Sequence, residues 1–537
     1  MMKSDFMQAV RQRIENKPPD VLKSMLIELA RHIPRGKYDE ALLVLGRSFA
    51  EDSQDDEDLL ASVRELCESA ESGFYDLSYE LDDEYNGGYW FENDTLVDED
   101  GLGEEIADLL IEAMHIIRQR RYSEALQAFD GLYSITIPGG DYDDIDISTL
   151  FNNDLINLSE TEVLQHYAYA ALMALSGEAR VKKVFEIIHS NIKLIHLRDI
   201  VQTGADEIPQ GDDFLRRWIR FLLEQTPLDL EQTPRYYEEA LIDAVRFSGG
   251  IKALSDFVKD HGGIYQTAYI ALMKDYIAAK QYAQVIATAN DGFAALKPLN
   301  INRAKIADLL LELGDALNDA QLVETATWEG FYSSAALGHF VSLYQLQNET
   351  LTGRAMRHLE AHQDVRDYYT IRFLNGDYDL VWKALKKDTN SLGWANSEKG
   401  KILPLFIALL SGANPVLPCT SKMIVSSYRN EKQCADFIQV LAESLQELSA
   451  ADYQTYYTWC LAETNGRVEA IIKGKHRGSY DKASALIVSM AEIIRSRGDS
   501  SGAAKFITRY KEKYPRHSSF ISCLRADIQV AKFGTLF

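Results

Sequence analysis

The chain repeats one local pattern, in which a helical stretch leads through a short turn to a tyrosine and a second helical stretch. The turns are rich in Gly, Arg, Lys or Gln and lie at 35–38, 119–122, 279–282 and 375–378. The second helices begin with residues that allow close packing: Ala41, Ala125, Val285 and Val381. Such residues let two helices approach, and a tyrosine can pack over the turn between them. The pattern predicts a series of helix–turn–helix hairpins.

Composition favours the same interpretation. The 537 residues include only 12 prolines, and alternating runs of β-branched residues are rare. With 46% hydrophobic residues, the chain can form a continuous core through stacked hairpins. We therefore expect an all-α solenoid.

Three segments resemble tetratricopeptide repeats, which implies paired helices stacked around a curved binding surface. The segment 484–515 matches the repeat signature most closely, and 106–138 and 266–298 match it with a late proline. The first match rests on Ile487, Met490, Ala491, Ile494, Ala503, Ile507, Tyr510 and Pro515. Because many families share this architecture, the resemblance indicates a fold and no particular function.

A second resemblance lies near the C-terminus. The residues from Lys473 to Tyr480, followed by helices and by Tyr514 to Leu524, are similar to the helical tail of bacterial SWIM-type zinc-finger proteins. The Cys-x-Cys and Cys-x-His pair that defines those proteins is absent from the sequence. The resemblance therefore implies kinship to their helical part only, without a zinc function.

Charge is distributed very unevenly along the chain. The net charge is −25, and the segment 65–179 alone contains 27 Asp or Glu against three Arg, which gives −24. The last segment, 467–537, contains 14 Lys or Arg against six Asp or Glu, which gives +8. Such a distribution steers basic partners to one end and acidic partners to the other, although acidic surfaces also serve solubility alone.

We divide the chain by charge and by turn composition into four segments. They are N-terminal helical hairpins (1–64), an acidic helical lobe with insertions (65–179), central helical repeats (180–411) and basic helical repeats (412–537). The last division falls at a turn-rich break, 412–418, between helical stretches. Ser159 and Glu162 form a capping box that predicts a helix to Leu175.

Two stretches of the acidic lobe do not have a helical pattern. The segments 82–103 and 135–153 are glycine-rich and acidic, and we expect two loop insertions, the second hairpin-like. Long loops in compact arrays are often functional. The first also mixes acids with aromatic residues, so we predict a partner-binding site made of Tyr79, Asp82, Asp83, Glu84, Tyr89, Trp90 and Phe91. Burial of these rings between hairpins is the alternative.

The sequence also contains possible metal ligands, but their patterns indicate a metal site only weakly. His358 and His362 share a helix face, as do His189 and His196, but neither pair has the order of a known zinc motif. Asp141, Asp143, Asp144 and Asp146 lack the central Gly and distal Glu of a calcium loop. We expect no metal and no cofactor, with ordinary polar surfaces at these positions.

The sequence leaves three classes of function open. Phosphate-binding glycine loops and the GxSxG motif are absent, which favours a non-enzymatic scaffold. Such a scaffold would bind a protein through its concave surface or through its acidic lobe, and the acidic lobe suits a basic partner. One alternative is a nucleic-acid-associated or nucleic-acid-mimicking factor, with phosphate contacts from Lys473, Lys475, Arg477, Arg509, Lys511, Lys513 and Arg516. A metal-dependent enzyme is the other.

The sequence shows no feature of a secreted or membrane-inserted protein. The N-terminal 17 residues have no apolar segment, and the longest apolar run, 402–410, contains Pro404. The five cysteines are scattered. We expect a soluble, cytoplasmic protein without a membrane partner and make no prediction of its oligomeric state.

Overall fold

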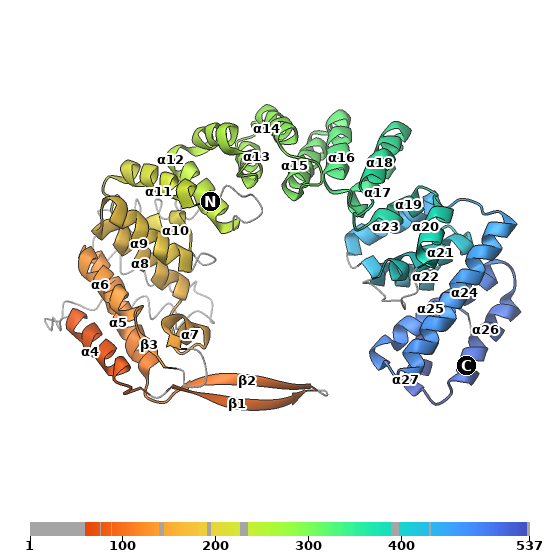
Figure 1. Cartoon of the computed structure of the whole chain (residues 1–537), viewed down its shortest axis with the longest axis horizontal. Helices are drawn as coiled ribbons and strands as arrows, with labels where there is room; N and C mark the ends of the chain where they lie inside the picture. The colour runs from red at the N-terminus through yellow and green to blue at the C-terminus, as the bar shows by residue number, and fades with distance from the viewer. Residues whose placement is uncertain are drawn as a thin grey trace, which may run out of the picture. The chain divides into compact units, whose positions relative to one another are not determined.

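The computed structural model describes residues 59–75, 77–86, 89–138, 144–190, 195–225, 235–387, 397–428 and 431–533 (Figure 1). These residues form 24 α-helices, a short 3₁₀ helix and two two-stranded sheets. The predicted all-α, solenoid-like fold is confirmed. The chain forms two compact units, 1–259 and 260–537, which divide within one helix, α12. These two units do not test the predicted division of the chain into four segments, which stays a prediction.

The first unit is a row of helices with one long hairpin of strands. The longer helices pack on one another in chain order: α5 on α6, α6 on α8, α8 on α9 and α9 on α11. Helix α12 is kinked where Gly249 and Gly250 leave the helical conformation. The elements are α4 (Leu59–Glu71), β1 (Leu77–Asn86), β2 (Tyr89–Asp98), α5 (Leu102–Arg118), α6 (Tyr122–Leu132), β3 (Thr136–Ile137), β4 (Ile145–Asp146), α7 (Ile147–Asn152), α8 (Glu160–Ala174), α9 (Gly177–Ser190), α10 (Leu197–Val201), α11 (Gly211–Gln225) and α12 (Arg235–His261).

The second unit begins as paired helices and ends as a compact bundle. Helix α13 packs on α14 and α15 on α16, whereas α25 is surrounded by α21, α22, α24, α26 and α27. Its elements are α13 (Thr267–Ala278), α14 (Tyr282–Ala295), α15 (Ile301–Leu317), α16 (Ala320–Ser334), α17 (Leu337–Gln345), α18 (Glu349–Ala361), α19 (Tyr368–Leu374), α20 (Tyr378–Lys386), α21 (Glu398–Ser411), α22 (Pro418–Tyr428), α23 (Glu431–Ser444), α24 (Ala450–Lys473), η3 (Arg477–Ser479), α25 (Tyr480–Ser496), α26 (Ser500–Lys513) and α27 (Ser518–Val530).

Three of the four predicted turns join helices as expected; the turn at 35–38 and Ala41 lie outside the described residues. The second residue of each has a positive φ: Arg120 (64°), Lys280 (56°) and Gly376 (88°). The next amide donates to the carbonyl five residues earlier: Arg121 to Ile116, Gln281 to Tyr276 and Asp377 to Arg372. This is the hydrogen bond of a Schellman motif, which satisfies the helix end and reverses the chain.

The prediction that 82–103 forms a loop is wrong. Most of this segment belongs to the antiparallel pair β1–β2, and its end begins α5. Asn86 pairs with Tyr89 at the end of the ladder. The sequence between them, Gly87-Gly88, lies outside the described residues, and Gly-Gly is a preferred sequence for a two-residue hairpin turn. The expectation of a hairpin-like second segment is confirmed by the short pair β3–β4. Ser159 also caps α8 as predicted, accepting from the amide of Glu162.

Candidate functional site

All seven residues of the predicted partner site lie on the β1–β2 hairpin, which we call the acidic arm (residues 77–98). The register brings the two parts of the prediction together. Asp82, Asp83 and Glu84 pair with positions 93, 92 and 91, so Glu84 lies opposite the end of the Tyr89–Phe91 run and the other two acids follow toward the base of the hairpin. Tyr79 lies further toward the base, opposite Leu96. The side chains of 78–95 are outside the described structure.

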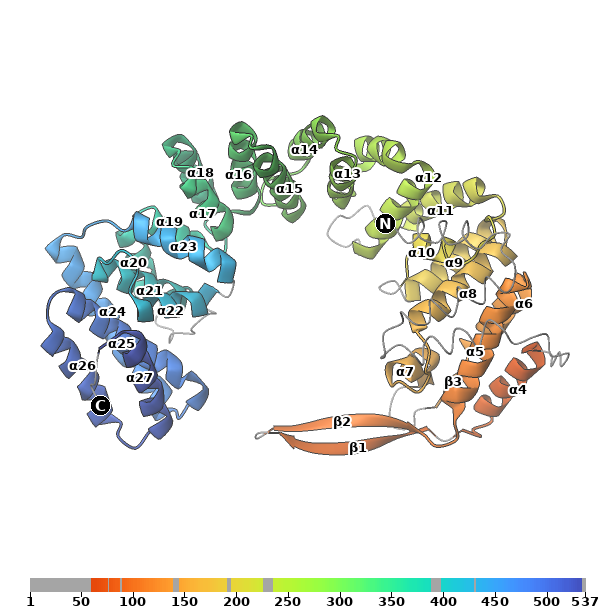
Figure 2. The same ribbon diagram turned by 180° about the vertical axis from the view of Figure 1, so that it is seen from behind.

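The acidic arm extends away from the helices of its own unit, as both views show (Figures 1 and 2). At about 3.4 Å per residue, ten-residue strands reach roughly 30 Å. The two strands form a two-stranded sheet, so within the described residues each has one edge without a ladder partner. Such edges are templates for an added strand.

The arm is strongly charged for a hairpin. Its strands contain seven Asp or Glu and no Lys or Arg. Asp83 and Glu92 occupy directly opposite positions in the register. Like charges at such positions destabilise an antiparallel pair, and an isolated two-stranded hairpin is only marginally stable in water. A bound cationic group would relieve this repulsion.

Asp98, the last residue of β2, fixes the arm to the first helix after it. Its carboxylate accepts hydrogen bonds from the amides of Gly101 and Leu102 at 3.0 Å each and from that of Gly103 at 2.7 Å. Those amides are the donors at the start of α5 that no helical carbonyl can satisfy. The carboxylate also lies at the positive end of the helix dipole, which attracts its negative charge.

A small core holds the base of the arm. Leu96 and Tyr75 are buried, and the Tyr75 hydroxyl donates to Glu105 of α5 at 2.7 Å. Burial, together with this hydrogen bond, raises the pKa of Tyr75, so the phenol keeps the proton that it donates. The start of α5 packs closely on Leu155, since a Cβ on Gly103 would clash with the Leu155 carbonyl oxygen.

Sequence reasoning missed the anchor of this site. Asp98 precedes a helical pattern by a few residues, and Glu104 and Glu105 follow in the first turn, which is a recognised N-terminal signature. The acids Glu92 and Asp94 of β2 were also missing from the predicted set, although their register places them opposite Asp83 and Leu81. The alternation of Leu77, Tyr79 and Leu81 with polar residues was the available signal for a strand.

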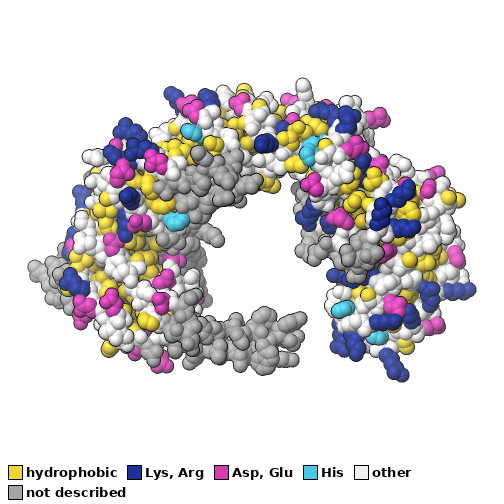
Figure 3. All heavy atoms as spheres, in the orientation of Figure 1, with side chains coloured by type: hydrophobic (Ala, Val, Ile, Leu, Met, Phe, Trp, Pro, Cys, Tyr) yellow, Lys and Arg dark blue, Asp and Glu magenta, His cyan; other side chains and the backbone are white. Residues whose placement is uncertain are grey.

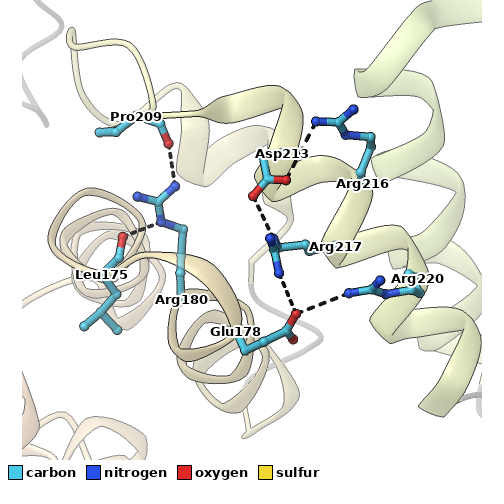
Figure 4. A network of polar contacts seen from close by, with 8 residues as sticks. All are labelled: Leu175, Glu178, Arg180, Pro209, Asp213, Arg216, Arg217 and Arg220. Carbon is cyan, nitrogen blue, oxygen red and sulfur yellow. Dashed lines mark hydrogen bonds and ion pairs between the residues drawn. The ribbon is translucent and has the colours of Figure 1, made fainter.

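At the end of the acidic lobe, a second charged cluster joins α9 to α11 (Figure 4). Arg180 is buried and donates to the carbonyls of Leu175 and Pro209, both at 2.5 Å. Arg217 lies between Asp213 (2.6 Å) and Glu178 (2.9 Å). The hydrogen bond from Arg217 holds the pKa of Asp213 below its usual value.

Two further arginines complete this cluster: Arg220 lies 3.2 Å from Glu178, and Arg216 lies 3.7 Å from Asp213. Every guanidinium drawn in Figure 4 thus faces a carbonyl or a carboxylate. The cluster therefore fastens two helices, and it does not present arginines suited to an external anion.

The histidine pairs lie in packed or paired surroundings. His358 is only 9% exposed, and its ring lies 4.6 Å from that of Tyr332 and 4.8 Å from that of His362. Burial and the neighbouring His362 lower the pKa of His358, and Arg303 adds to this effect. The charge of Arg303 would also repel a metal ion. His196 lies 3.7 Å from Asp243, and His189 stacks on Phe185.

One chain of side chains has the composition of a catalytic triad. His339 lies 2.7 Å from Ser334 Oγ through Nδ1 and 2.8 Å from Asp308 through Nε2. The Ser334 hydroxyl also lies 3.0 Å from the carbonyl of Gly330 and accepts from the amide of Ala336. Because the hydroxyl already serves the junction between α16 and α17, we interpret this chain as a clasp between helices.

Within the described ranges, no group of three His, Cys, Asp or Glu is placed to hold a metal ion. Of the acidic run at 141–146, the first two aspartates lie outside the described residues, and Asp146 caps α7 through the amide of Thr149. A crevice beside the buried Trp218 has a free volume of about 20 Å³, which suits a water molecule and not an organic ligand.

Comparison with known proteins adds no family to this description. No protein-family model matches the chain, and no curated protein matches it. Among the helices of the described residues, none is both long and apolar enough to cross a lipid bilayer.

Proposed function

We propose that the protein is a non-enzymatic scaffold that captures a basic protein partner with its acidic arm. The observation that carries this proposal is the arm itself, a two-stranded sheet with seven acids and no basic residue, anchored at its base by Asp98. We further propose that the helical pairs are tetratricopeptide-like repeats and that they act as the frame that presents the arm.

Two physical features support a basic protein as the ligand. The open edges of β1 and β2 suit an extended segment that adds as a further strand. The −24 charge of residues 65–179 attracts cations over a distance set by the Debye length, about 8 Å near 0.15 M salt. A basic strand would gain backbone hydrogen bonds from the edge and Coulomb attraction from the acids.

The test uses a labelled peptide of alternating Lys and Val as the probe, with a Glu–Val peptide of equal length as its counterpart. Association and dissociation rates are measured by stopped-flow fluorescence with the full chain. The first variant replaces Asp82, Asp83 and Glu84 by Asn, Asn and Gln. The matched control replaces three exposed acids on α4 of the same lobe, Glu65, Glu68 and Glu71, by Gln.

We expect the arm variant to slow association of the Lys–Val peptide by about tenfold, since charge sets the encounter rate. The α4 control should slow it much less, because the lobe keeps its acids at the contact. Trp90→Ala should chiefly speed dissociation if the ring anchors the peptide. Equal binding of the Lys–Val and Glu–Val peptides, or equal effects of the arm variant and the control, would contradict the proposal.

The alternative in which the rings between Tyr79 and Phe91 are buried makes a different prediction. In that case Trp90→Ala lowers the thermal stability of the protein and leaves peptide dissociation unchanged. Measuring the melting temperature beside the rates separates the two readings.

A further inference from the structure

The C-terminal bundle presents a basic surface formed by two turns that are distant in sequence. The residues 473–477 and 511–517, which we call the basic face, contain six Lys or Arg and a single Glu. The first turn follows the end of α24 at Lys473, and the second includes the end of α26 at Lys513. Figure 3 shows Lys and Arg side chains over the α24–α27 end of this unit.

A buried aromatic cluster holds the two turns together. Tyr480 follows the first turn, Tyr514 belongs to the second, and both rings lie 6.1 Å from that of the fully buried Phe520. The Tyr480 hydroxyl also lies 3.2 Å from Nδ1 of His517. Because these rings are packed, the basic face is a fixed feature of the bundle.

Most of the positive residues of the basic face are exposed to solvent. Lys475, Arg477, Lys513 and Arg516 are exposed. Lys473 pairs with Glu469, and Lys513 is close enough to add to the lowering of the Glu469 pKa that Lys473 causes. The ends of α24 and α26 therefore contribute to one positive surface.

We propose that the basic face binds the acidic arm of a second copy of the chain, so that copies associate head to tail. This inference rests on the proposed function and names the basic partner as another molecule of the same protein. Charge complementarity carries it: one segment of the chain holds −24 and the last 71 residues hold +8. The contact is heterologous, so it extends to further copies unless a ring closes.

The net charge of −25 favours this occupant over a nucleic acid. A nucleic acid is uniformly negative, and the chain as a whole would repel it. A second copy is negative overall but also carries a basic face, which can attract the arm of the next copy. Copies still repel one another through their remaining acids. That long-range repulsion is screened at about 0.1 M ionic strength, where the Debye length is about 10 Å, while a close contact survives.

Association should therefore depend on salt in a particular way. We expect it to be strongest near 0.1 M ionic strength and weaker at both about 0.01 M and about 1 M, where the Debye lengths are about 30 Å and 3 Å. Sedimentation velocity of the full chain measures it against the monomer mass of 60.7 kDa. Apolar association would instead strengthen steadily with salt.

Three variants make the test specific to the two surfaces. The face variant replaces Lys475, Arg477 and Arg516 by Gln, and the arm variant replaces Asp82, Asp83 and Glu84 by Asn, Asn and Gln. The control replaces three exposed cations elsewhere in the second unit by Gln: Lys274, Lys297 and Arg357.

Each of the face and arm variants should remain monomeric alone, and the control should associate like the unmodified chain. A mixture of the face and arm variants should form a dimer and nothing larger, because only one intact arm and one intact face can meet. A dimer from the mixture, absent from either variant alone, would establish the head-to-tail contact.

The inference is overturned if the unmodified chain is monomeric at every salt concentration, or if the mixture stays monomeric. It is equally overturned if a labelled single-stranded oligonucleotide binds the basic face of a chain that does not self-associate. If the Lys–Val peptide binds the arm while the chain stays monomeric, the proposed function stands and only this inference fails. If neither occurs, both fail.

Discussion

Asp98→Ala tests the anchor of the acidic arm. The substitution removes the carboxylate that accepts three amide hydrogen bonds at the start of α5, at 3.0, 3.0 and 2.7 Å. The substitution shortens only this side chain and leaves its neighbours unchanged. We expect the first turn of α5 and the base of the arm to open more often.

The magnitude follows from two contributions. Although the N-cap of α5 is Gly101, the Asp98 carboxylate accepts from the first amides as a capping side chain does. Removing such a capping group costs about 0.5–2 kcal/mol, and losing a negative charge at a helix N-terminus costs about 0.3–1 kcal/mol. Together they give about 2 kcal/mol for Asp98→Ala, which is roughly a 30-fold rise in local opening at 1.4 kcal/mol per factor of ten. Asp98→Asn keeps an acceptor and loses only the charge, so we expect about a threefold rise.

Hydrogen exchange of peptides covering 99–110, followed by mass spectrometry, measures this opening. The matched control is Glu99→Gln, which removes a neighbouring exposed charge. The reasoning is refuted if Asp98→Ala exchanges like the unmodified chain, or if Glu99→Gln has an equal effect. If exchange is fastest in Asp98→Ala, slower in Asp98→Asn and slowest in the unmodified chain, both the lost hydrogen bonds and the lost charge contribute.

Three other substitutions test the frame. Arg180→Met should lower the free energy of unfolding of the first unit by about 3 kcal/mol, because two charge-assisted hydrogen bonds from a buried guanidinium are lost. Arg216→Met, at an exposed ion pair, should change it by about 0.5 kcal/mol, and urea unfolding compares the two variants. Burial raises the pKa of the Glu492 carboxyl above its ordinary value of 4.5, so the folded protein holds this proton at a pH where the unfolded chain has lost it. The contribution of Glu492 to the free energy of unfolding therefore falls as the pH rises above 4.5. Glu492→Gln should flatten the pH dependence of the unfolding free energy in that range, measured by urea unfolding at several pH values. Ala503 is fully buried on α26, so Ala503→Leu should overpack the contact and cost about 1–3 kcal/mol, measured as a fall in melting temperature.

Local chemistry explains why the helical frame could be predicted. The turns at 119–122, 279–282 and 375–378 each lie between two helical patterns, and all three join the helices of a hairpin. Only the last contains a glycine, Gly376, at its positive-φ position. The cap at Ser159 involves residues three positions apart, so the sequence contains the whole interaction. Ala503, chosen from the repeat pattern, is likewise buried where the pattern requires a small side chain.

The candidate site was predicted in part. Its composition, with acids at 82–84 beside aromatics at 89–91, is plain in the sequence, but its conformation was misjudged because acids and glycines disfavour strands individually. Pairing of β1 with β2 outweighs those preferences, since a ladder of backbone hydrogen bonds forms only when both strands are present. The Gly87-Gly88 dipeptide was the local signal for that pairing.

What the sequence determined by itself is thus the helical periodicity, the turns, the caps within one helical turn and the uneven charge. The tertiary structure alone decided which distant polar groups meet. Glu492 accepts from the amides of Cys419 and Thr420, 73 and 72 residues away, and so caps α22 from another helix. Tyr480 and Tyr514 likewise join two basic turns through Phe520. Such contacts depend on how helices stack, and stacking is set by the summed packing of many side chains, which no local pattern encodes.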